Sequence, residues 1–152
     1  MERAEARALA VVEGAERGPY DWGLIHADLR PSNIMITTDE TGREELTVID
    51  FDDCGQTWYL YDFASALSFM EHCEGAPGWA QDWVEGYTSV TDLSDDELDL
   101  ACALSMLRRL QMLGWTTTHR EDALPADLWG AEVPGSARVA RDYLADSRWL
   151  LR

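Results

Sequence analysis

The sequence predicts an α+β domain that is mostly helical and carries one small β-hairpin among its helices. The first segment, residues 2–17, is rich in Ala, Glu and Arg, which favour helix. Two short runs of β-favouring residues, 34–37 and 46–49, flank a polar connection, which is typical of a hairpin. After Tyr59, apolar residues recur at helical spacing between breaks that contain Gly or Pro.

The composition is that of one globular domain with a hydrophobic core. The chain has 152 residues, 46% of them hydrophobic, and includes the aromatic residues that disordered chains lack. Its formal net charge of −17 repels phosphate backbones, so nucleic acid is excluded as an expected partner. The same charge would favour a cationic small molecule, although an acidic surface also serves solubility alone.

Neither a targeting signal nor a membrane span is expected from the sequence. The N-terminal segment carries acids and lacks the apolar core of a signal peptide, and no apolar run approaches about 18 residues. The three cysteines are widely spaced and form no CxxC pair, so neither a zinc site nor a disulfide framework is indicated. We therefore expect a cytoplasmic protein with reduced cysteines and no membrane partner.

The elements expected in the first part of the chain position two polar segments. The first helix is expected to end at Gly18-Pro19, and the short apolar run 23–25 follows. The hairpin would then bring residues 26–33 and residues 50–53 side by side, since each segment adjoins one of its strands.

Further helices are expected in the second part of the chain. Their ranges are 60–72, 79–87, 94 to about 113, and 134–149. Ser94 and Glu97 have the spacing of a capping box, in which each side chain bonds the backbone N–H of the other residue. The segment 121–135 is punctuated by Pro and Gly and is expected to be a loop.

The segment HADLRPSN, residues 26–33, carries the residue types that phosphoryl transfer needs. That reaction depends on positioning and charge neutralisation more than on covalent chemistry. Asp28 can accept the proton of an attacking hydroxyl, and the amide oxygen of Asn33 can coordinate Mg²⁺. A metal site needs a further carboxylate, and Asp50 is placed for this role at the end of the second expected strand.

Two more acids, Asp52 and Asp53, follow Asp50 closely. They could extend the metal site or be ordinary turn residues, because Asp is frequent in turns. A metal-dependent hydrolase built on this acidic cluster is a further interpretation. It is disfavoured because hydrolases with such a nucleophile also use a Lys, whereas the 12 basic residues of this chain are all Arg.

The segment 26–33 resembles the catalytic loop of eukaryotic-type protein kinases, and IDFDD at 49–53 resembles their metal-binding D-F-G element. The small residue at position 27 and the DFD sequence are closer to the aminoglycoside phosphotransferase family, which includes choline kinases; Ala27 stands where that family typically has Gly. The segment WYLYDFASAL, residues 58–67, resembles the Tyr-Asp pair that opens a helix in this family. By motif, the resemblance covers residues 23–67.

The resemblance implies a kinase-like C-terminal lobe and a chemical role for five residues. Asp28 would be the catalytic base, and Arg30 would steady the transferring phosphoryl group. Asn33 and Asp50 would hold Mg²⁺ with ATP or GTP, and Asp52 is a further metal candidate. The substrate would be a hydroxyl group of a small molecule.

Other residues would support the site or lie outside it. The resemblance implies that His26 braces the metal-binding segment and that Asp62 holds the backbone of the catalytic loop. Arg108 and Arg109 could reach a substrate, but we expect them on a solvated helix face.

The resemblance also implies a second lobe that this sequence does not supply. Kinases of this design hold the nucleotide with a Gly-rich loop and a Lys from an N-terminal lobe, whereas only 25 residues precede His26 and none of the 152 is Lys. We interpret residues 1–152 as a single C-terminal lobe. It would work with an N-lobe on another chain, be a fragment, or be a non-catalytic remnant that acts as a binding module. An uncovered lobe would favour self-association through its apolar surface.

Overall fold

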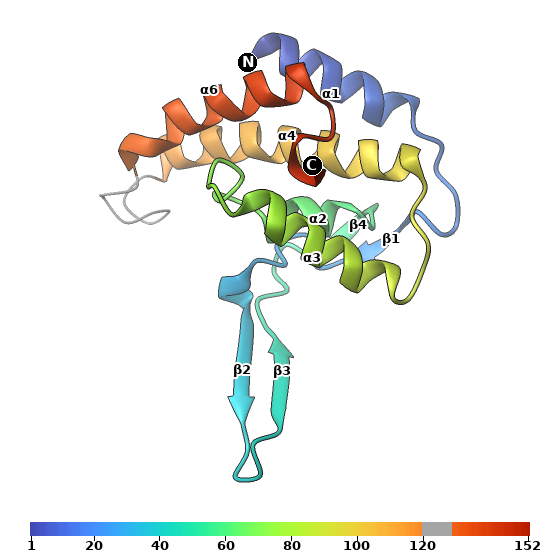
Figure 1. The fold of residues 1–152 in the computed structure, drawn as a ribbon, viewed down its shortest axis with the longest axis vertical. Helices are drawn as coiled ribbons and strands as arrows, with labels where there is room; N and C mark the ends of the chain where they lie inside the picture. The colour runs from blue at the N-terminus through green and yellow to red at the C-terminus, as the bar shows by residue number, and fades with distance from the viewer. Residues whose placement is uncertain (120–128) are drawn as a thin grey trace.

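The computed structural model describes residues 1–119 and 129–152, and its architecture is mostly helical (Figure 1). The helices are α1 (Glu2–Gly14), α2 (Tyr61–Ala66), α3 (Ala76–Thr88), α4 (Asp95–Thr118) and α6 (Trp129–Ala145), with 3-10 turns η1 (Pro31–Asn33) and η2 (Trp149–Leu151). The strands are β1 (Trp22–Ile25), β2 (Ile34–Thr38), β3 (Glu44–Val48) and β4 (Gly55–Trp58). The predicted α+β, mostly helical class is confirmed. None of the described helices is long and apolar enough to cross a membrane.

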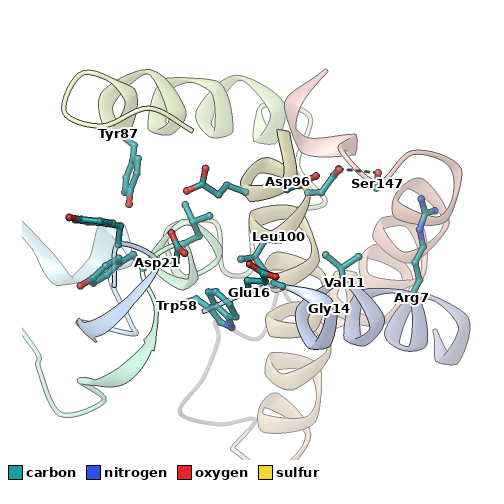
Figure 2. Close-up of a pocket in the computed structure, with 16 residues that line it drawn as sticks. Arg7, Val11, Gly14, Glu16, Asp21, Trp58, Tyr87, Asp96, Leu100 and Ser147 are labelled. Atoms are coloured by element: carbon teal, nitrogen blue, oxygen red, sulfur yellow. Dashed lines mark hydrogen bonds between the residues drawn. The ribbon is translucent and has the colours of Figure 1, made fainter. Parts of the chain in front are cut away.

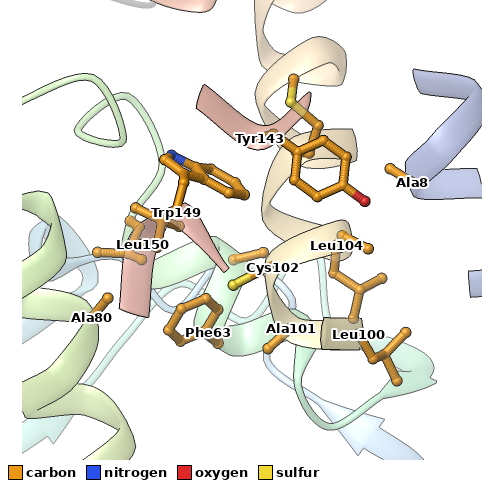
Figure 3. Packing of buried hydrophobic residues seen from close by; sticks show 14 of the residues in the cluster. Ala8, Phe63, Ala80, Leu100, Ala101, Cys102, Leu104, Tyr143, Trp149 and Leu150 are labelled. Atoms are coloured by element: carbon orange, nitrogen blue, oxygen red, sulfur yellow. The ribbon is translucent and has the colours of Figure 1, made fainter. Parts of the chain in front are cut away.

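The long helix α4 is the centre of the helical body, and α1, α2 and α6 all pack against it (Figure 1). Figure 3 shows the core that these helices share with η2. Phe63 of α2, Leu104 of α4 and Tyr143 of α6 are each no more than 5% exposed there, and the Tyr143 ring meets Trp149 edge-on at 5.3 Å. Burial of side chains of this size stabilises the fold by about 1.5–3 kcal/mol each. The loops at the edge of this body are therefore attached to a closely packed core.

The first helix is shorter than predicted. It ends at Gly14, and Ala15 has already turned to an extended conformation with φ −73° and ψ 132°. Glycine costs a helix about 1 kcal/mol relative to Ala, which explains why the helix stops there and not at residue 17. Ala4 and Ala8, which are fully buried, allow α1 to approach α4 closely.

The capping box predicted at the start of α4 is confirmed. The Glu97 N–H donates to the Ser94 hydroxyl at 3.3 Å, and the Ser94 N–H donates to the Glu97 carboxylate at 2.7 Å. The helix continues past its predicted end near residue 113 to Thr118. Threonine hydroxyls in this last turn donate to the carbonyls of Leu113 and Trp115, so these polar side chains bond back to their own helix.

The predicted hairpin is confirmed as the antiparallel pair β2–β3, which projects from the helical body (Figure 1). Its register pairs Ile34 with Val48 and Ile36 with Leu46. At its tip, the Asp39 carboxylate accepts from the Thr41 N–H at 2.8 Å, which is the local bond expected of Asp in a turn.

A second antiparallel pair, β1–β4, was not predicted. The four-residue strand Gly55–Trp58 lacks the alternation of apolar and polar residues by which a strand is recognised, although its partner is the expected apolar run. Trp22 and Trp58 are opposite each other and their rings meet edge-on at 5.5 Å. This sheet leads directly into the segment 26–33, so it anchors the start of that loop.

Two helix boundaries differ from prediction around α2 and α3. The helix expected over 60–72 ends at Ala66, and Phe69 follows with φ +68°, which no helix accommodates. The helix expected to begin at Trp79 begins at Ala76. Pro77 therefore lies in its first turn, where the missing N–H of proline costs nothing, instead of breaking the chain.

The last helix also differs from prediction. Residues 129–135 were expected in a loop but belong to α6, which contains Pro134 and ends at Ala145 instead of Trp149. The remainder of that expected loop, residues 121–128, lies outside the described residues.

Candidate active site

The segment 26–33 forms a loop between β1 and β2 that α2 holds in place. The Asp62 carboxylate accepts from the backbone N–H groups of His26 and Ala27, at 3.3 and 2.9 Å. The Ser65 hydroxyl donates to the Ala27 carbonyl at 2.8 Å. Burial raises the pKa of the Asp62 carboxyl, and the two N–H donors act in the opposite direction. These bonds hold Ala27 at φ +64°, a conformation uncommon for residues other than Gly.

Asp28, the predicted catalytic base, is 9% exposed within this loop. Arg108 of α4 donates to its Oδ1 at 2.5 Å. Arg30 and Asn33 each donate to its Oδ2 at 3.1 Å. The carboxylate is therefore held by two guanidinium groups and one amide, in a single orientation.

Ile49 joins this loop to Asp50. The Ile49 N–H donates to the Asn33 carbonyl at 3.0 Å, and the Ile49 carbonyl lies 2.9 Å from Nε2 of His26. The His26 ring also packs against Phe51 at 4.6 Å between centroids. The hairpin thus brings the two polar segments together, as the sequence predicts.

Asp28 lines a pocket of about 460 Å³. Asp50 and Asp53 line it from the segment after β3, while α2 and α4 contribute walls that include Tyr61, Gln111, Met112 and Trp115. The non-glycine residues with positive φ in the described part of the chain are Ala27, Asp50 and Phe69, and all of them line this pocket. Backbone strain of this kind is concentrated at functional sites.

The oxygen atoms around this pocket suit a hard divalent cation. Asn33 donates through its amide nitrogen, so its amide oxygen, 3.4 Å from the Ser32 hydroxyl, remains as an acceptor. Asp50 and Asp53 add carboxylates, whereas Asp52 is exposed and does not line the pocket. Within residues 1–119 and 129–152, no group of three His, Cys, Asp or Glu side chains could hold a metal alone. Mg²⁺ commonly takes few protein ligands and completes its shell with phosphates and water, so the residues present fit a nucleotide-bound ion.

The expected solvated position of Arg108 and Arg109 is wrong. Their exposed fractions are 5% and 0%. Arg108 bonds Asp28, whereas Arg109 bonds the Glu71 carboxylate at 2.9 Å and the Ser136 hydroxyl at 2.8 Å. The sequence did carry a signal, because this stretch of α4 is apolar on every side and a helix of that kind is buried.

A larger pocket of about 710 Å³ lies between α1, β4 and the first turns of α4 (Figure 2). Several of its carboxylates already have partners: Asp21 accepts from the Gly18 N–H, and Asp99 accepts from Arg148. The predicted site residues do not line this pocket. The predicted chemistry therefore concerns the smaller pocket around Asp28.

The structure is similar to solved small-molecule kinases. It matches a microcompartment-associated aminopropanol kinase with a TM-score of 0.77 at 34% identity, over 99% of this chain and 47% of that protein. It matches an amicoumacin kinase, solved with AMP-PNP, Ca²⁺ and Ami, with a TM-score of 0.64 at 20% identity, over 92% of this chain and 43% of that protein. The second likeness concerns the fold alone. The predicted kinase-like fold is confirmed, and the chain spans about half the length of these kinases.

Sequence comparisons also match this chain to kinases and phosphotransferases. A protein of Invertebrate iridescent virus 3 that bears the name of a serine/threonine-protein kinase is 30% identical over 67 residues, which are 42% of this chain and 20% of the viral protein. The profile of the phosphotransferase enzyme family, APH, matches residues 2–98, which include the segment 26–33, the β2–β3 hairpin and Asp62. This match covers more than half of the chain. The chain therefore belongs to the phosphotransferase enzyme family.

Proposed function

We propose that this chain supplies the catalytic and metal-binding part of a phosphotransferase that moves the γ-phosphoryl group of ATP or GTP to a hydroxyl of a small molecule. The observation that carries the proposal is the position of Asp28. Three donors orient its carboxylate in a pocket that Asp50 and Asp53 also line. Such a pocket offers a base for the hydroxyl beside oxygen ligands for a metal, which is the combination that phosphoryl transfer uses.

In the proposed reaction, Asp28 accepts the proton of the acceptor hydroxyl while that oxygen bonds to the γ-phosphorus. The bond from this phosphorus to the leaving nucleoside diphosphate breaks in the same step. Arg30 has a side chain that is 31% exposed and can turn from Asp28 toward the transferring group. Mg²⁺, held by Asn33 and Asp50 in the pocket that Asp53 also lines, would neutralise charge on the phosphates.

A nucleotide-binding lobe is proposed to cover the β2–β3 hairpin. Ile36, Leu46 and Phe51 are 63%, 67% and 55% exposed, and apolar surface of this kind indicates a partner. The same lobe would supply the phosphate-binding Lys that these 152 residues lack. The greater length of the similar aminopropanol kinase, 47% of which this chain covers, supports such an addition. Self-association through the hairpin would be another way to cover it.

The proposed acceptor is a short amino alcohol. The aminopropanol kinase, which is 34% identical over nearly the whole chain, is named for such a compound. The net charge of −17 favours the approach of a cation. Tyr61 and Trp115 line the pocket, and aromatic rings attract an ammonium group that lies against them.

The first test of this function is isothermal titration of the 152-residue chain with Mg²⁺–ATP and with Mg²⁺–GTP, using Asp50→Ala as the control variant. We expect the titration heat of the parent chain to disappear in the variant. Equal binding by both proteins would refute the metal role of Asp50.

The second test measures phosphate transfer to aminopropanol, with the chain alone and with a nucleotide-binding lobe of the similar kinase added. Transfer that depends on Asp28 would support the phosphotransferase. A non-catalytic binding module is the second candidate, and the absence of Lys favours it. That candidate keeps the metal-binding groove but has lost nucleotide binding, so it predicts no nucleotide binding by the chain alone and no transfer under either condition.

A further inference from the structure

We infer that Arg108 of α4 is a positioning residue that fixes the orientation of the Asp28 carboxylate for phosphoryl transfer. The inference rests on the proposed role of Asp28 as the base. Arg108 lies beyond residues 2–98, the segment that matches the family profile. Its role is therefore read from its contacts in this structure.

The guanidinium group of Arg108 has a partner on each of its three nitrogens. Nε donates to the Ser68 hydroxyl at 2.5 Å, and Nη1 donates to the Ala27 carbonyl at 3.1 Å and to the Tyr61 hydroxyl at 3.0 Å. Nη2 donates to Asp28 Oδ1 at 2.5 Å. With 5% exposure and this set of bonds, the group has one position available. Arg108 thus ties α4 to α2 and to the loop that carries Asp28.

This position determines where the Asp28 carboxylate points. Arg108 holds Oδ1, and Arg30 and Asn33 hold Oδ2, so rotation of the carboxylate would break bonds at both oxygens. A carboxylate has about four acceptor sites, so these bonds still leave one for a substrate hydroxyl. Lysine could not replace this arrangement, because only the planar guanidinium fork reaches several acceptors in fixed directions.

The same stretch of α4 also borders the space where an acceptor would lie. Gln111, Met112 and Trp115 line the Asp28 pocket one to two turns after Arg108, and the Tyr61 hydroxyl that accepts from Arg108 donates to Gln111 at 3.1 Å. This wall of the pocket and the residue that orients the base therefore belong to one helix. A shift of α4 would move both together.

The experiment compares Arg108→Lys and Arg108→Met with Arg109→Lys, a matched change at the neighbouring buried arginine, whose carboxylate partner is Glu71. One readout is the side-chain amide resonance of Asn33 in a nitrogen–proton NMR spectrum, because this amide donates to Asp28 at 3.1 Å. The other is phosphate transfer, under the conditions in which the parent protein is active, with kcat and KM measured separately.

We expect both Arg108 variants to shift the Asn33 resonance and to lower kcat about 10- to 100-fold, with KM for the nucleotide within about 2-fold of the parent value. Arg109→Lys should leave the resonance and the kcat of the folded protein unchanged. An unmoved Asn33 resonance in folded Arg108→Lys, or a kcat equal to that of the parent, would overturn the inference. If the parent protein transfers no phosphate at all, the proposed function fails, and the Asn33 resonance alone decides whether Arg108 orients Asp28.

Discussion

Arg108 and Arg109 are consecutive residues of α4, yet they belong to two different regions of the molecule. The Arg108–Asp28 pair borders the pocket, and its side chains are 5% and 13% exposed. The Arg109–Glu71 pair is sealed between α4, α6 and the segment after α2, and both side chains are 0% exposed. Consecutive helical residues point about 100° apart, so within one turn a helix can direct one side chain to a pocket and the next to the core.

The comparison shows that one kind of ion pair has two different consequences. A sealed pair mainly compensates for the cost of burying its own charges, and it becomes costly when one partner is removed. A pair that borders a pocket keeps an oxygen within reach of a ligand. We therefore expect changes at Glu71 to affect folding first and changes at Asp28 to affect the reaction first.

The largest expected effect is that of Asp28→Asn on transfer. The amide keeps the shape of the side chain but cannot accept the hydroxyl proton, so kcat should fall about 10²- to 10⁴-fold. The rate of phosphate transfer measures this change. The urea unfolding midpoint should move far less than it does in Glu71→Leu. Turnover equal to that of the parent protein would remove Asp28 from the mechanism.

Glu71→Leu should affect stability strongly and phosphate transfer little, which is the reverse of Asp28→Asn. It leaves the Arg109 charge buried beside an apolar side chain, which should lower the free energy of unfolding by about 3–5 kcal/mol. Urea denaturation measures this loss, and the kcat of the remaining folded protein should be unchanged. The double change Glu71→Leu with Arg109→Met should recover much of the lost stability. If it recovers none, the loss in Glu71→Leu does not come from the unpaired Arg109 charge.

Asp62→Ala tests the link between the loop and α2 and should have an intermediate effect. It removes the acceptor of two backbone N–H groups, those of His26 and Ala27, at about 1–3 kcal/mol for each group left unsatisfied. Hydrogen exchange at these two amides should accelerate, and kcat should fall because Asp28 follows directly. Asp62→Asn retains one acceptor oxygen, so its amide exchange rates and its kcat should lie between those of the parent protein and those of Asp62→Ala. Unchanged exchange in Asp62→Ala would show that other contacts hold the loop.

Local patterns were sufficient to predict the elements whose partners are close in the sequence. The Ser94–Glu97 capping box spans three residues, and the β2–β3 hairpin pairs strands that a short turn connects. Both were predicted correctly, because the spacing itself determines which groups can meet. The loop 26–33 was singled out for the same reason, since its residue types stand in a fixed order.

Partners that are distant in the sequence were not predictable in this way. Arg108 and Asp28 are 80 residues apart, and nothing in either local pattern states that they meet. The strand Gly55–Trp58 exists because it pairs with β1, which lies far before it in the chain. Helical periodicity could at most indicate that Arg108 is buried, because it describes one helix and not the neighbour that this helix contacts.

The smallest expected effect depends on pH and lies in the region of Arg109. His72 packs there against Gly135, so closely that an added Cβ at Gly135 would lie 2.8 Å from its ring. Burial and the positive charges of Arg109 and Arg138 lower the pKa of His72 below its ordinary value of 6.5. Its Nδ1 is buried and has no hydrogen-bond partner among the described residues.

Because the folded state binds the His72 proton less readily than the unfolded state, stability is lost as the pH falls through 6.5 toward the lower folded pKa. His72→Gln has no proton to bind, so its free energy of unfolding should decline less between about pH 7 and about pH 5 than that of the parent protein. Urea unfolding of both proteins at several pH values measures the difference in slope. Asp28 lies in the other region, so Asp28→Asn should leave the contribution of His72 in place. Identical pH profiles for the parent and His72→Gln would mean that the region around Arg109 opens enough to accommodate the protonated ring.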